Sequence, residues 1–433
     1  MLSKMPAFNL KAVLRETGLA ADTLRAWERR YGLPKPQRTG GGHRLYSQYD
    51  IEIIKWLISR QAEGLSISRA VDLWNEISAS GTDPLAGNQV SNLSNAPSVT
   101  ADTTLDAVRA EWIAACLSFD EIKAEQAINH AFSMFQVEAV CLEVLQKGLS
   151  EIGKLWYTNQ ATVQQEHFAS GLAMRRIDAL LIAHPQPTRP QTILVGCPPD
   201  EWHTFTPLLL SLLLRRRGLN VVYLGANIPS ERFAETAKKI KADLVILVAQ
   251  TLVSAASLKR ILLALSYEGT ATAFGGRIFN VRPSIIDYIS GHFLGTDVEH
   301  SLEIIENILQ GKAKTKLPKI VDQSHVAALR VFTTKRFLIE STLKTNLEPL
   351  PISPEEMNNG IYFLGNNIAA ALQLGDMEHV SEEMDWLKNL LKVHNRPPQE
   401  LEKFMESYFN AIEEQINGQG EPIKKWLKNY IGA

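Results

Sequence analysis

Two acid–histidine pairs are the residues of this chain best suited to hold a metal or a cofactor. Glu201 and His203 are separated by one residue. They lie between an apolar run typical of a buried strand and one typical of a helix. Trp156 is followed, after nine residues, by Glu166 and His167. A carboxylate beside an imidazole can hold its tautomer and raise its basicity, which suits a metal ligand. One histidine on a helical bundle and one on a strand-to-helix loop can sandwich a large flat ligand.

The segment around His203 alternates short apolar runs with helical stretches. This pattern predicts a Rossmann-like domain with a doubly wound parallel sheet over residues 189–318. The predicted strands are Thr192–Gly196, Val221–Gly225, Leu244–Ala249, Ala271–Gly275 and His292–Gly295. Ligands of such sheets bind beyond the carboxyl ends of the strands. The residues expected in that crevice are His203, Gly225, Thr251, Gly275, Gly276 and Gly295.

Helices dominate the rest of the chain, so the expected fold class is multidomain α and α/β. Residues 105–188 have helical periodicity throughout, which predicts a four-helix bundle. Residues 79–104 are rich in Ser, Asn, Gly, Thr and Pro and are predicted to be a linker. Residues 319–433 are predicted to form a helical C-terminal domain, with a capping box at Ser353-Pro354-Glu355-Glu356. No pattern in that domain points to a role.

The composition limits the class of protein. A chain of 433 residues favours roughly three or four domains. Its three cysteines, Cys116, Cys141 and Cys197, have no CxxC or metal-binding spacing, which favours a reducing compartment. No apolar run reaches the roughly 18 residues of a membrane span, so we expect a cytoplasmic protein without a membrane partner. The net charge of −2 hides a basic head with nine Lys/Arg against three Asp/Glu in residues 1–46.

The basic head, residues 1–78, is predicted to bind DNA. The stretch Thr23–Gly32 is helical and places Arg25 and Arg29 on one face, from which they can reach guanine edges or phosphates. The glycine-containing loop 38–46 can bring further cations onto the phosphate backbone. Alternatively, Arg29 and Arg30 only form salt bridges with Glu28 and neighbouring residues. A nucleotide P-loop is not expected, because no Lys-Ser/Thr follows the glycines of the loop.

The segment Lys11–Leu73 resembles the winged helix-turn-helix of the MerR family. The matching motifs are Leu24-Arg25-x-Trp27-Glu28-Arg29-Arg30-Tyr31-Gly32, Gly42-His43-Arg44-x-Tyr46 and Asp50-Ile51. The resemblance implies a regulator of double-stranded operator DNA, with Trp27 and Tyr31 partly in the core. The candidate DNA contacts are Thr23, Arg25, Arg29, Arg30, Arg38, His43, Arg44 and Tyr46.

Residues 105–315 resemble the cobalamin-binding module of the CarH type of light-responsive regulator and, more distantly, that of methionine synthase. The resemblance covers a helical bundle followed by a Rossmann-like sheet. The matching motifs are Trp-x9-Glu-His from Trp156, Glu-x-His ending at His203, Leu224-Gly225-x-x-x-Pro229 and Phe274-Gly275-Gly276. Adenosylcobalamin is therefore the expected cofactor, with methylcobalamin as the alternative.

By this resemblance, His203 is the lower axial ligand of cobalt and Glu201 its acid partner. The tail of the cofactor would lie in a slot lined by Thr251, Leu252, Gly275 and Gly276, with Gly225 and Gly295 in the same site. The upper face, where the family holds a 5′-deoxyadenosyl group, would be covered by Trp156, Glu166 and His167. Alternatively, Trp156 is ordinary bundle core and Glu166-His167 a solvated pair.

The chain departs from the cobalamin-binding pattern at three places. Thr206 stands where the family has glycine after Glu-x-His, and its branched side chain can crowd the tail. The usual Ser-x-Leu of the third strand loop appears as Gln250-Thr251-Leu252. Some light-sensing members have a histidine directly after the bundle tryptophan, which captures cobalt after photolysis. Tyr157 occupies that position here.

Together these features predict a cobalamin-dependent, light-responsive transcriptional regulator, with repression as the expected mode and no enzymatic activity. In the family, adenosylcobalamin fixes an oligomer that holds DNA and light disassembles it, so we expect a homo-oligomer, dimer or tetramer. One alternative is a regulator of the same architecture whose ligand is lost or replaced by another chromophore or a protein partner, which Thr206 and Tyr157 motivate. The other is a corrinoid methyltransferase component, against which the DNA-binding head counts.

Overall fold

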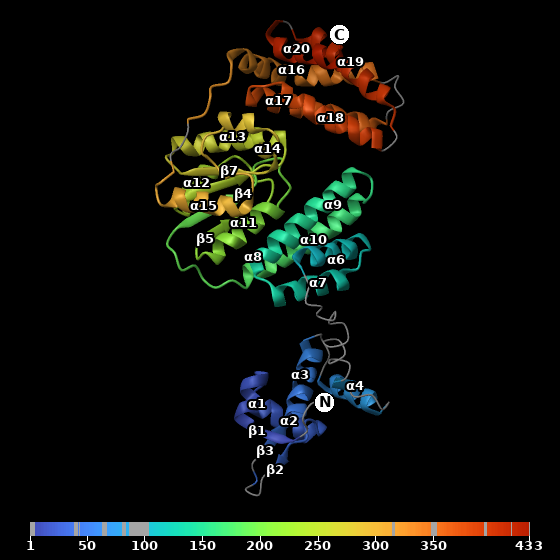
Figure 1. The fold of residues 1–433 in the computed structure, drawn as a ribbon, viewed down its shortest axis with the longest axis vertical. Helices are drawn as coiled ribbons and strands as arrows, with labels where there is room; N and C mark the ends of the chain where they lie inside the picture. The colour runs from blue at the N-terminus through green and yellow to red at the C-terminus, as the bar shows by residue number, and fades with distance from the viewer. Residues whose placement is uncertain are drawn as a thin grey trace. The chain divides into compact units, whose positions relative to one another are not determined.

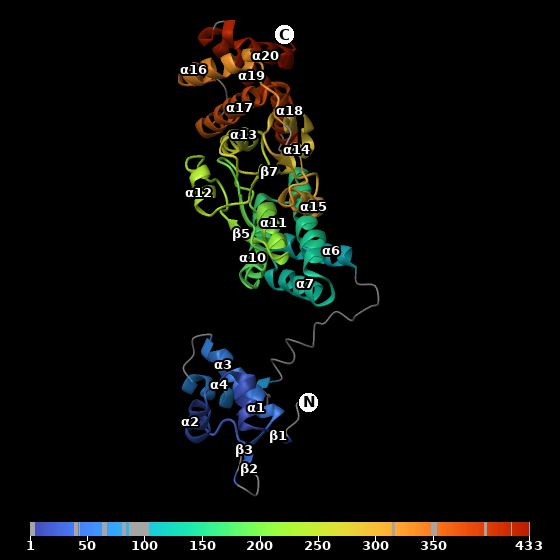
Figure 2. The ribbon, with the colours of Figure 1, turned by 90° about the vertical axis from the view of Figure 1, so that its left-hand side faces the viewer.

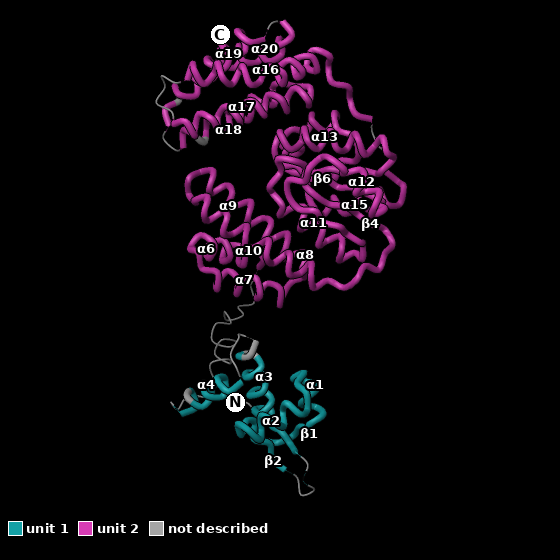
Figure 3. The backbone as a smooth tube through the Cα atoms, turned by 180° about the vertical axis from the view of Figure 1, so that it is seen from behind, with its two compact units in different colours: residues 1–103 teal, residues 104–433 magenta. Residues whose placement is uncertain are grey.

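The structure, a computed structural model, describes residues 5–38, 42, 44–62, 67–79, 84–85, 104–313, 317–347, 353–393, 396–416 and 418–432 (Figure 1). The chain divides into two compact units, Met1–Thr103 and Thr104–Ala433 (Figure 3). Within the described ranges, one hydrophobic core fills the first unit and two fill the second.

The first unit is a winged helix-turn-helix, as predicted. Its helices are α1 (Leu10–Thr17), α2 (Ala21–Tyr31), α3 (Gln48–Ala62) and α4 (Ile67–Ala79). Its strands pair antiparallel in the order β1 (Pro6–Asn9), β3 (Arg44–Ser47), β2 (Gln37–Arg38). Leu24 and Trp27 of α2 share one core with Tyr46 of β3, so the wing and the helix are held together by apolar burial.

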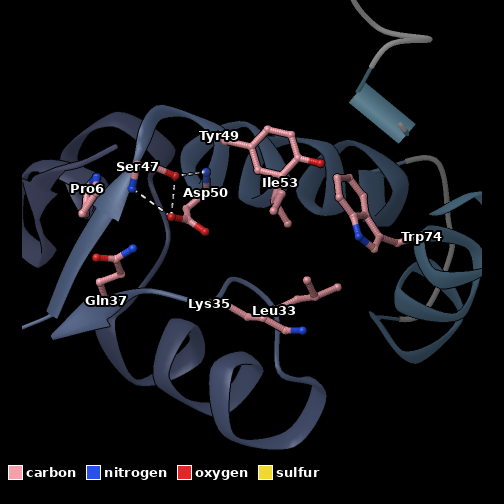
Figure 4. Close-up of a pocket in the computed structure, with 9 residues that line it drawn as sticks. All are labelled: Pro6, Leu33, Lys35, Gln37, Ser47, Tyr49, Asp50, Ile53 and Trp74. Carbon is pink, nitrogen blue, oxygen red and sulfur yellow. Dashed lines mark hydrogen bonds between the residues drawn. The ribbon is translucent and has the colours of Figure 1, made fainter. Parts of the chain in front are cut away.

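Ser47 joins the wing to α3 through a reciprocal cap. Its backbone N–H and its hydroxyl donate to the Asp50 carboxylate over 2.8 and 2.6 Å, and the Asp50 N–H donates to the Ser47 hydroxyl over 3.1 Å. Such a cap fixes the start of a helix and explains why an aspartate follows the wing in the motif. Both residues border a surface hollow of about 270 Å³ that Lys35 and Trp74 also line (Figure 4).

The second unit begins with the predicted helical bundle. Its helical segments are α6 (Leu105–Leu117), α7 (Glu121–Met134), α8 (Val137–Ala139), the π-helix η1 (Val140–Gln146), α9 (Lys147–Tyr157) and α10 (Val163–Ile182). The backbone stays helical from α8 through η1 to α9, so these three act as one long helix. Trp112 is buried against Gly148, where a Cβ would come within 2.8 Å of its ring, so α6 and α9 pack closely.

Five parallel strands follow the bundle, which confirms the predicted sheet. They are β4 (Thr192–Gly196), β5 (Asn220–Tyr223), β6 (Leu244–Val248), β7 (Thr272–Gly275) and β8 (His292–Phe293). Their order in the sheet is β5-β4-β6-β7-β8. The order reverses between β4 and β6, which makes a topological switch point, the usual place for a ligand. The loops after these two strands carry His203 and Thr251.

Both faces of the sheet are covered. The covering helices are α11 (Phe205–Arg216), α12 (Phe233–Lys239), α13 (Leu252–Tyr267), α14 (Arg277–Val281), the 3-10 helix η2 (Pro283–Tyr288) and α15 (Val298–Leu309). Side chains of β6 alternate: Val245 and Leu247 join one core, and Leu244 and Ile246 the other. The second core is shared with the bundle through α11, and the first continues through α13 (Figure 1).

The C-terminal domain is helical and lies against α13 and α14 (Figures 1 and 2). Its helices are α16 (Gln323–Leu347), α17 (Pro354–Leu374), α18 (Glu378–Val393), α19 (Pro398–Gln415), the 3-10 helix η3 (Gly418–Gly420) and α20 (Glu421–Ile431). The capping box of Ser353 and Glu356 is present as predicted. Of the helices in the described ranges, none combines the length and the hydropathy that crossing a bilayer requires.

Two cations of the Rossmann-like domain hold the C-terminal domain. Lys259 on α13 donates to the backbone carbonyl of Gln373 over 2.7 Å and lies 5.5 Å from the ring centre of Tyr288. Arg282, directly after α14, donates to the backbone carbonyl of His379, and its side chain is only 4% exposed. Burial lowers the pKa of Lys259 to about 8. The interface therefore carries desolvated charge as well as apolar contacts.

We predict that Lys259 makes stability rise with pH in the alkaline range. Between about pH 8 and the unfolded value of 10.5, the folded protein binds fewer protons at this lysine than the unfolded chain, so folding is favoured as pH rises. Urea midpoints of the wild type and of Lys259→Met, measured at pH 7.5 and 9.5, should diverge in favour of the wild type at the higher pH. Exposed Lys239, changed to Met, is the control. Parallel curves for Lys259→Met would contradict the prediction.

Candidate functional site

The loop after β4 presents one imidazole on a buried carboxylate. Glu201 has no exposed surface. Its Oε1 accepts the backbone N–H of His203 over 2.9 Å and lies 2.7 Å from His203 Nδ1. The His203 side chain is 69% exposed. With Nδ1–H directed to the carboxylate, the Nε2 lone pair of the neutral ring is left for a metal.

The second oxygen of Glu201 ties this loop to the next strand across the switch point. Oε2 accepts the backbone N–H of Gln250 over 2.6 Å and the Ser254 hydroxyl over 2.7 Å. Thr251 caps α13 and exchanges hydrogen bonds with Ser254, so the start of the helix is fixed as well. Gln250 and Ser254 were not predicted as site residues. The Thr-x-x-Ser spacing places Ser254 in the first turn of a helix, but no local sequence pattern connects it to Glu201.

The electrostatics of the pair favour an ionised carboxylate and a basic imidazole. Burial alone would raise the pKa of Glu201, but hydrogen bonds from His203, Gln250 and Ser254 hold it below its ordinary value. The hydrogen bond to Glu201 raises the pKa of His203 against the opposing effect of burial. The charge of Glu166 also raises the pKa of His203, and that of Arg277 lowers it. The backbone N–H of Arg277 donates to Gln250 Oε1 over 2.9 Å, which makes Arg277 a further neighbour of the site that local sequence did not indicate.

The residues predicted for the upper face come from the bundle. Trp156 is half-buried near the end of α9. Glu166 and His167 lie in the first turns of α10, with Glu166 Oε2 2.9 Å from His167 Nδ1. The His167 side chain is 76% exposed. The Thr204 hydroxyl, in the loop after β4, lies 3.2 Å from Sδ of Met174 on α10, so the structure brings α10 and this loop together.

The residues predicted for the tail slot and for the rest of the crevice differ in exposure. Thr251, from the slot, and Gly225 and Gly295, from the wider crevice, are partly exposed just past strand ends. Leu252 is fully buried in the core at the start of α13, and its place in the slot stays a prediction. Gly275 is buried at the end of β7.

Gly276 is required by the backbone itself. Its φ is +124°, and a Cβ there would come within 1.9 Å of the Ala249 carbonyl oxygen. The glycine thus allows the backbone after β7 to approach the backbone after β6. That it also leaves room for the cofactor tail stays a prediction. Thr206, the departure from the family motif, is half-buried in the first turn of α11.

The donor set of the site fits a metal that brings its other ligands with it. Among the residues that the structure describes, no group of three or more His, Cys, Asp and Glu side chains can hold a metal ion. The three cysteines are buried, and burial raises the pKa of each thiol to about 12. A single exposed imidazole with a fixed tautomer suits the cobalt of a corrinoid, because the macrocycle supplies the equatorial nitrogens.

The head presents a cationic surface on α2 and the wing. Thr23, Arg25, Arg29, Arg30 and Arg38 are all exposed. Arg25 pairs with Asp22 over 3.4 Å, where both side chains are solvated, so this contact is easily exchanged for a phosphate. The guanidinium of Arg30 lies 5.4 Å from the ring centre of its neighbour Tyr31. His43 lies outside the described residues.

Glu28 ties the wing to α2 from beneath that surface. Arg44 Nε donates to Glu28 Oε2 over 2.7 Å, and the Tyr46 hydroxyl donates to Oε1 over 2.5 Å. Tyr46 has no exposed surface, and burial followed by the hydrogen bond to Glu28 raises its pKa. This corrects the prediction that Tyr46 touches DNA: its side chain supports the wing. Because Glu28 pairs with Arg44, the alternative in which Arg29 and Arg30 neutralise Glu28 does not describe this structure.

Comparison with known proteins matches three segments of the chain. The MerR HTH family regulatory protein matches residues 8–76, and B12 binding domains match residues 108–181 and 191–290. The HTH-type transcriptional repressor CarH of Myxococcus xanthus is 29% identical over 245 residues, which cover 57% of this chain and 79% of that protein. The repressor CarA of the same organism is 30% identical over 241 residues, 55% of this chain and 75% of CarA.

Among solved structures, the monomethylamine corrinoid protein of Methanosarcina barkeri is 16% identical, with a TM-score of 0.40, over 47% of this chain and 97% of that one. The family of the chain is assigned from the sequence matches to CarA, to the MerR family and to the B12 binding domains, and not from this structural likeness. The chain therefore belongs to the family of MerR-type transcriptional regulators with B12-binding domains that includes CarA and CarH.

Proposed function

We propose that this protein is a light-responsive repressor in which adenosylcobalamin controls oligomerisation and operator binding. The observation that carries the proposal is the exposed imidazole of His203 fixed by buried Glu201 at the switch point of the sheet. The same chain carries a head whose exposed arginines suit double-stranded DNA. A corrinoid site and a DNA-binding site in one chain are the parts that a cofactor-sensing regulator needs.

Within the proposed site, His203 would hold the cobalt of the corrinoid, and Glu201 would fix the orientation of its ring. Thr251, Leu252, Gly275 and Gly276 are proposed for the tail slot, with the partly exposed Gly225 and Gly295 in the same site. The bundle residues Trp156, Glu166 and His167 are proposed for the upper face. A bound alkylcobalamin supplies a cobalt–carbon bond that light can cleave.

Control of assembly requires two states that hold the cofactor with different affinity. Trp156, Glu166 and His167 would rest on a bulky upper group, and α9 and α10 would be free to shift once nothing occupies that space. We therefore propose a homo-oligomer, dimer or tetramer, in the dark and dissociation in the light. The light-sensing relatives use a histidine after the bundle tryptophan to keep the cobalt, and Tyr157 offers no such ligand.

We predict that the acid–histidine pair determines corrinoid retention. His203→Ala should weaken binding of adenosylcobalamin in the dark well beyond tenfold, and Glu201→Gln about tenfold, because an outer partner typically contributes 10- to 100-fold to metal affinity. Binding is measured by the corrinoid absorbance retained after gel filtration. His325→Ala, in the C-terminal domain, is the control. A wild type that retains no corrinoid would overturn the proposed function.

We predict that Arg29 contacts a DNA phosphate. Arg29→Ala should weaken operator binding across sequences and reduce the slope of log affinity against log salt by about 0.9, the contribution of one phosphate contact. Gel shifts at several salt concentrations measure the slope, and exposed Arg232 changed to Ala is the control. An unchanged slope would remove Arg29 from the interface.

We predict that illumination releases both the corrinoid and the DNA. Without an imidazole at Tyr157, the light-exposed protein should lose its corrinoid on gel filtration, and Tyr157→His should keep it longer. Gel shifts and light scattering, in the dark and after illumination, follow DNA binding and assembly. Operator binding that ignores both cobalamin and light would instead favour a regulator with a different ligand.

A further inference from the structure

The C-terminal domain meets the helical bundle through α18. The ring of Trp386 on α18 stacks on the ring of Tyr157, with the centres 6.2 Å apart and the planes 18° from parallel. Tyr157 is the last residue of α9 and directly follows Trp156, which is proposed for the upper face. In Figure 1, α18 and the tip of α9 face each other. The stack therefore joins the C-terminal domain to the bundle beside the upper face.

The same face of α18 is anchored to the Rossmann-like domain. His379, Glu382, Glu383 and Trp386 recur at spacings of three and four residues, so they lie along one side of the helix. Arg282 donates to the His379 carbonyl and pairs with Glu382 and Glu383 at 3.3 and 3.2 Å. A buried guanidinium with several partners holds the helix in one orientation.

The segment after β7 links α18 to the loops around Glu201. Arg277, at the start of α14, donates its backbone N–H to Gln250 Oε1 over 2.9 Å, and the Gln250 N–H donates in turn to Glu201. Arg282, directly after α14, holds α18 through the His379 carbonyl. On the other side, the Thr204 hydroxyl lies 3.2 Å from Met174 Sδ, so α10 contacts the loop that carries His203.

We propose that α18 forms a wall of the corrinoid site, with Trp386 and Tyr157 contacting the upper axial group and selecting for a nucleoside-sized one. This inference rests on the proposed function. Aromatic side chains that line a site bury flat apolar ligand surface at low entropic cost. A nucleoside has the flat surface that such a pair would bury, and a methyl group does not. The C-terminal domain is thereby part of the site rather than an appended module.

The test compares two corrinoids in the dark. We expect Trp386→Ala to weaken adenosylcobalamin binding by about tenfold, the effect of one lost aromatic contact, and to change methylcobalamin binding by less than about twofold. Trp386→Phe, which keeps a ring, should retain the preference. Tyr362→Ala, an exposed aromatic on α17, is the matched control and should change neither affinity.

A second variant keeps the test independent of the folding of α18. Tyr157→Ala removes the other ring and should lower the preference for adenosylcobalamin to the same extent. The double variant should lose no more than either single one, because the two rings act as a unit. Two outcomes would overturn the proposal that α18 forms a wall of the site. One is that both variants bind adenosylcobalamin as tightly as the wild type. The other is that they lose affinity equally for both corrinoids. A wild type that binds neither corrinoid would overturn the proposed function, and this inference with it.

Discussion

A buried carboxylate holds the candidate site together. An ionised side chain without exposed surface is costly unless it is fully hydrogen-bonded. Glu201 meets that condition with the His203 N–H and ring and with the Gln250 N–H and Ser254 hydroxyl. These partners come from the loops on either side of the switch point. One charge therefore sets the tautomer of the exposed imidazole and the spacing of the loops that border the crevice.

The sheet separates two hydrophobic cores, and the site lies at its edge. One core is shared with the bundle and the other with the C-terminal domain. A ligand at the carboxyl ends of the strands can therefore act on both the bundle and the C-terminal domain from one edge of the sheet. Lys259 and Arg282 bind the C-terminal domain to the elements that follow β6 and β7. A shift of the loops after these two strands would therefore be transmitted to the C-terminal domain.

A second acid, the partly buried Glu28, organises the head in a similar way. Glu28 accepts hydrogen bonds from Arg44 and Tyr46 of the wing, and this fixes β3 against α2. Arg25 and Arg29, one turn apart on α2, remain exposed. The hydroxyl of Tyr46 is hydrogen-bonded inside the protein, and the exposed arginines remain available to DNA.

The sequence alone determined the elements and the local pairs. Period-two and period-3.6 patterns depend on neighbours a few residues apart, so the five strands, the bundle, the Ser353 cap and the Glu201–His203 pair were all predictable. The surroundings of those residues were not. That Leu252 and Tyr46 are buried, that Gly276 faces a backbone carbonyl, and that Trp386 meets Tyr157 depend on which faces pack across long sequence separations. Local propensity carries no information about such contacts, and only the tertiary fold decides them.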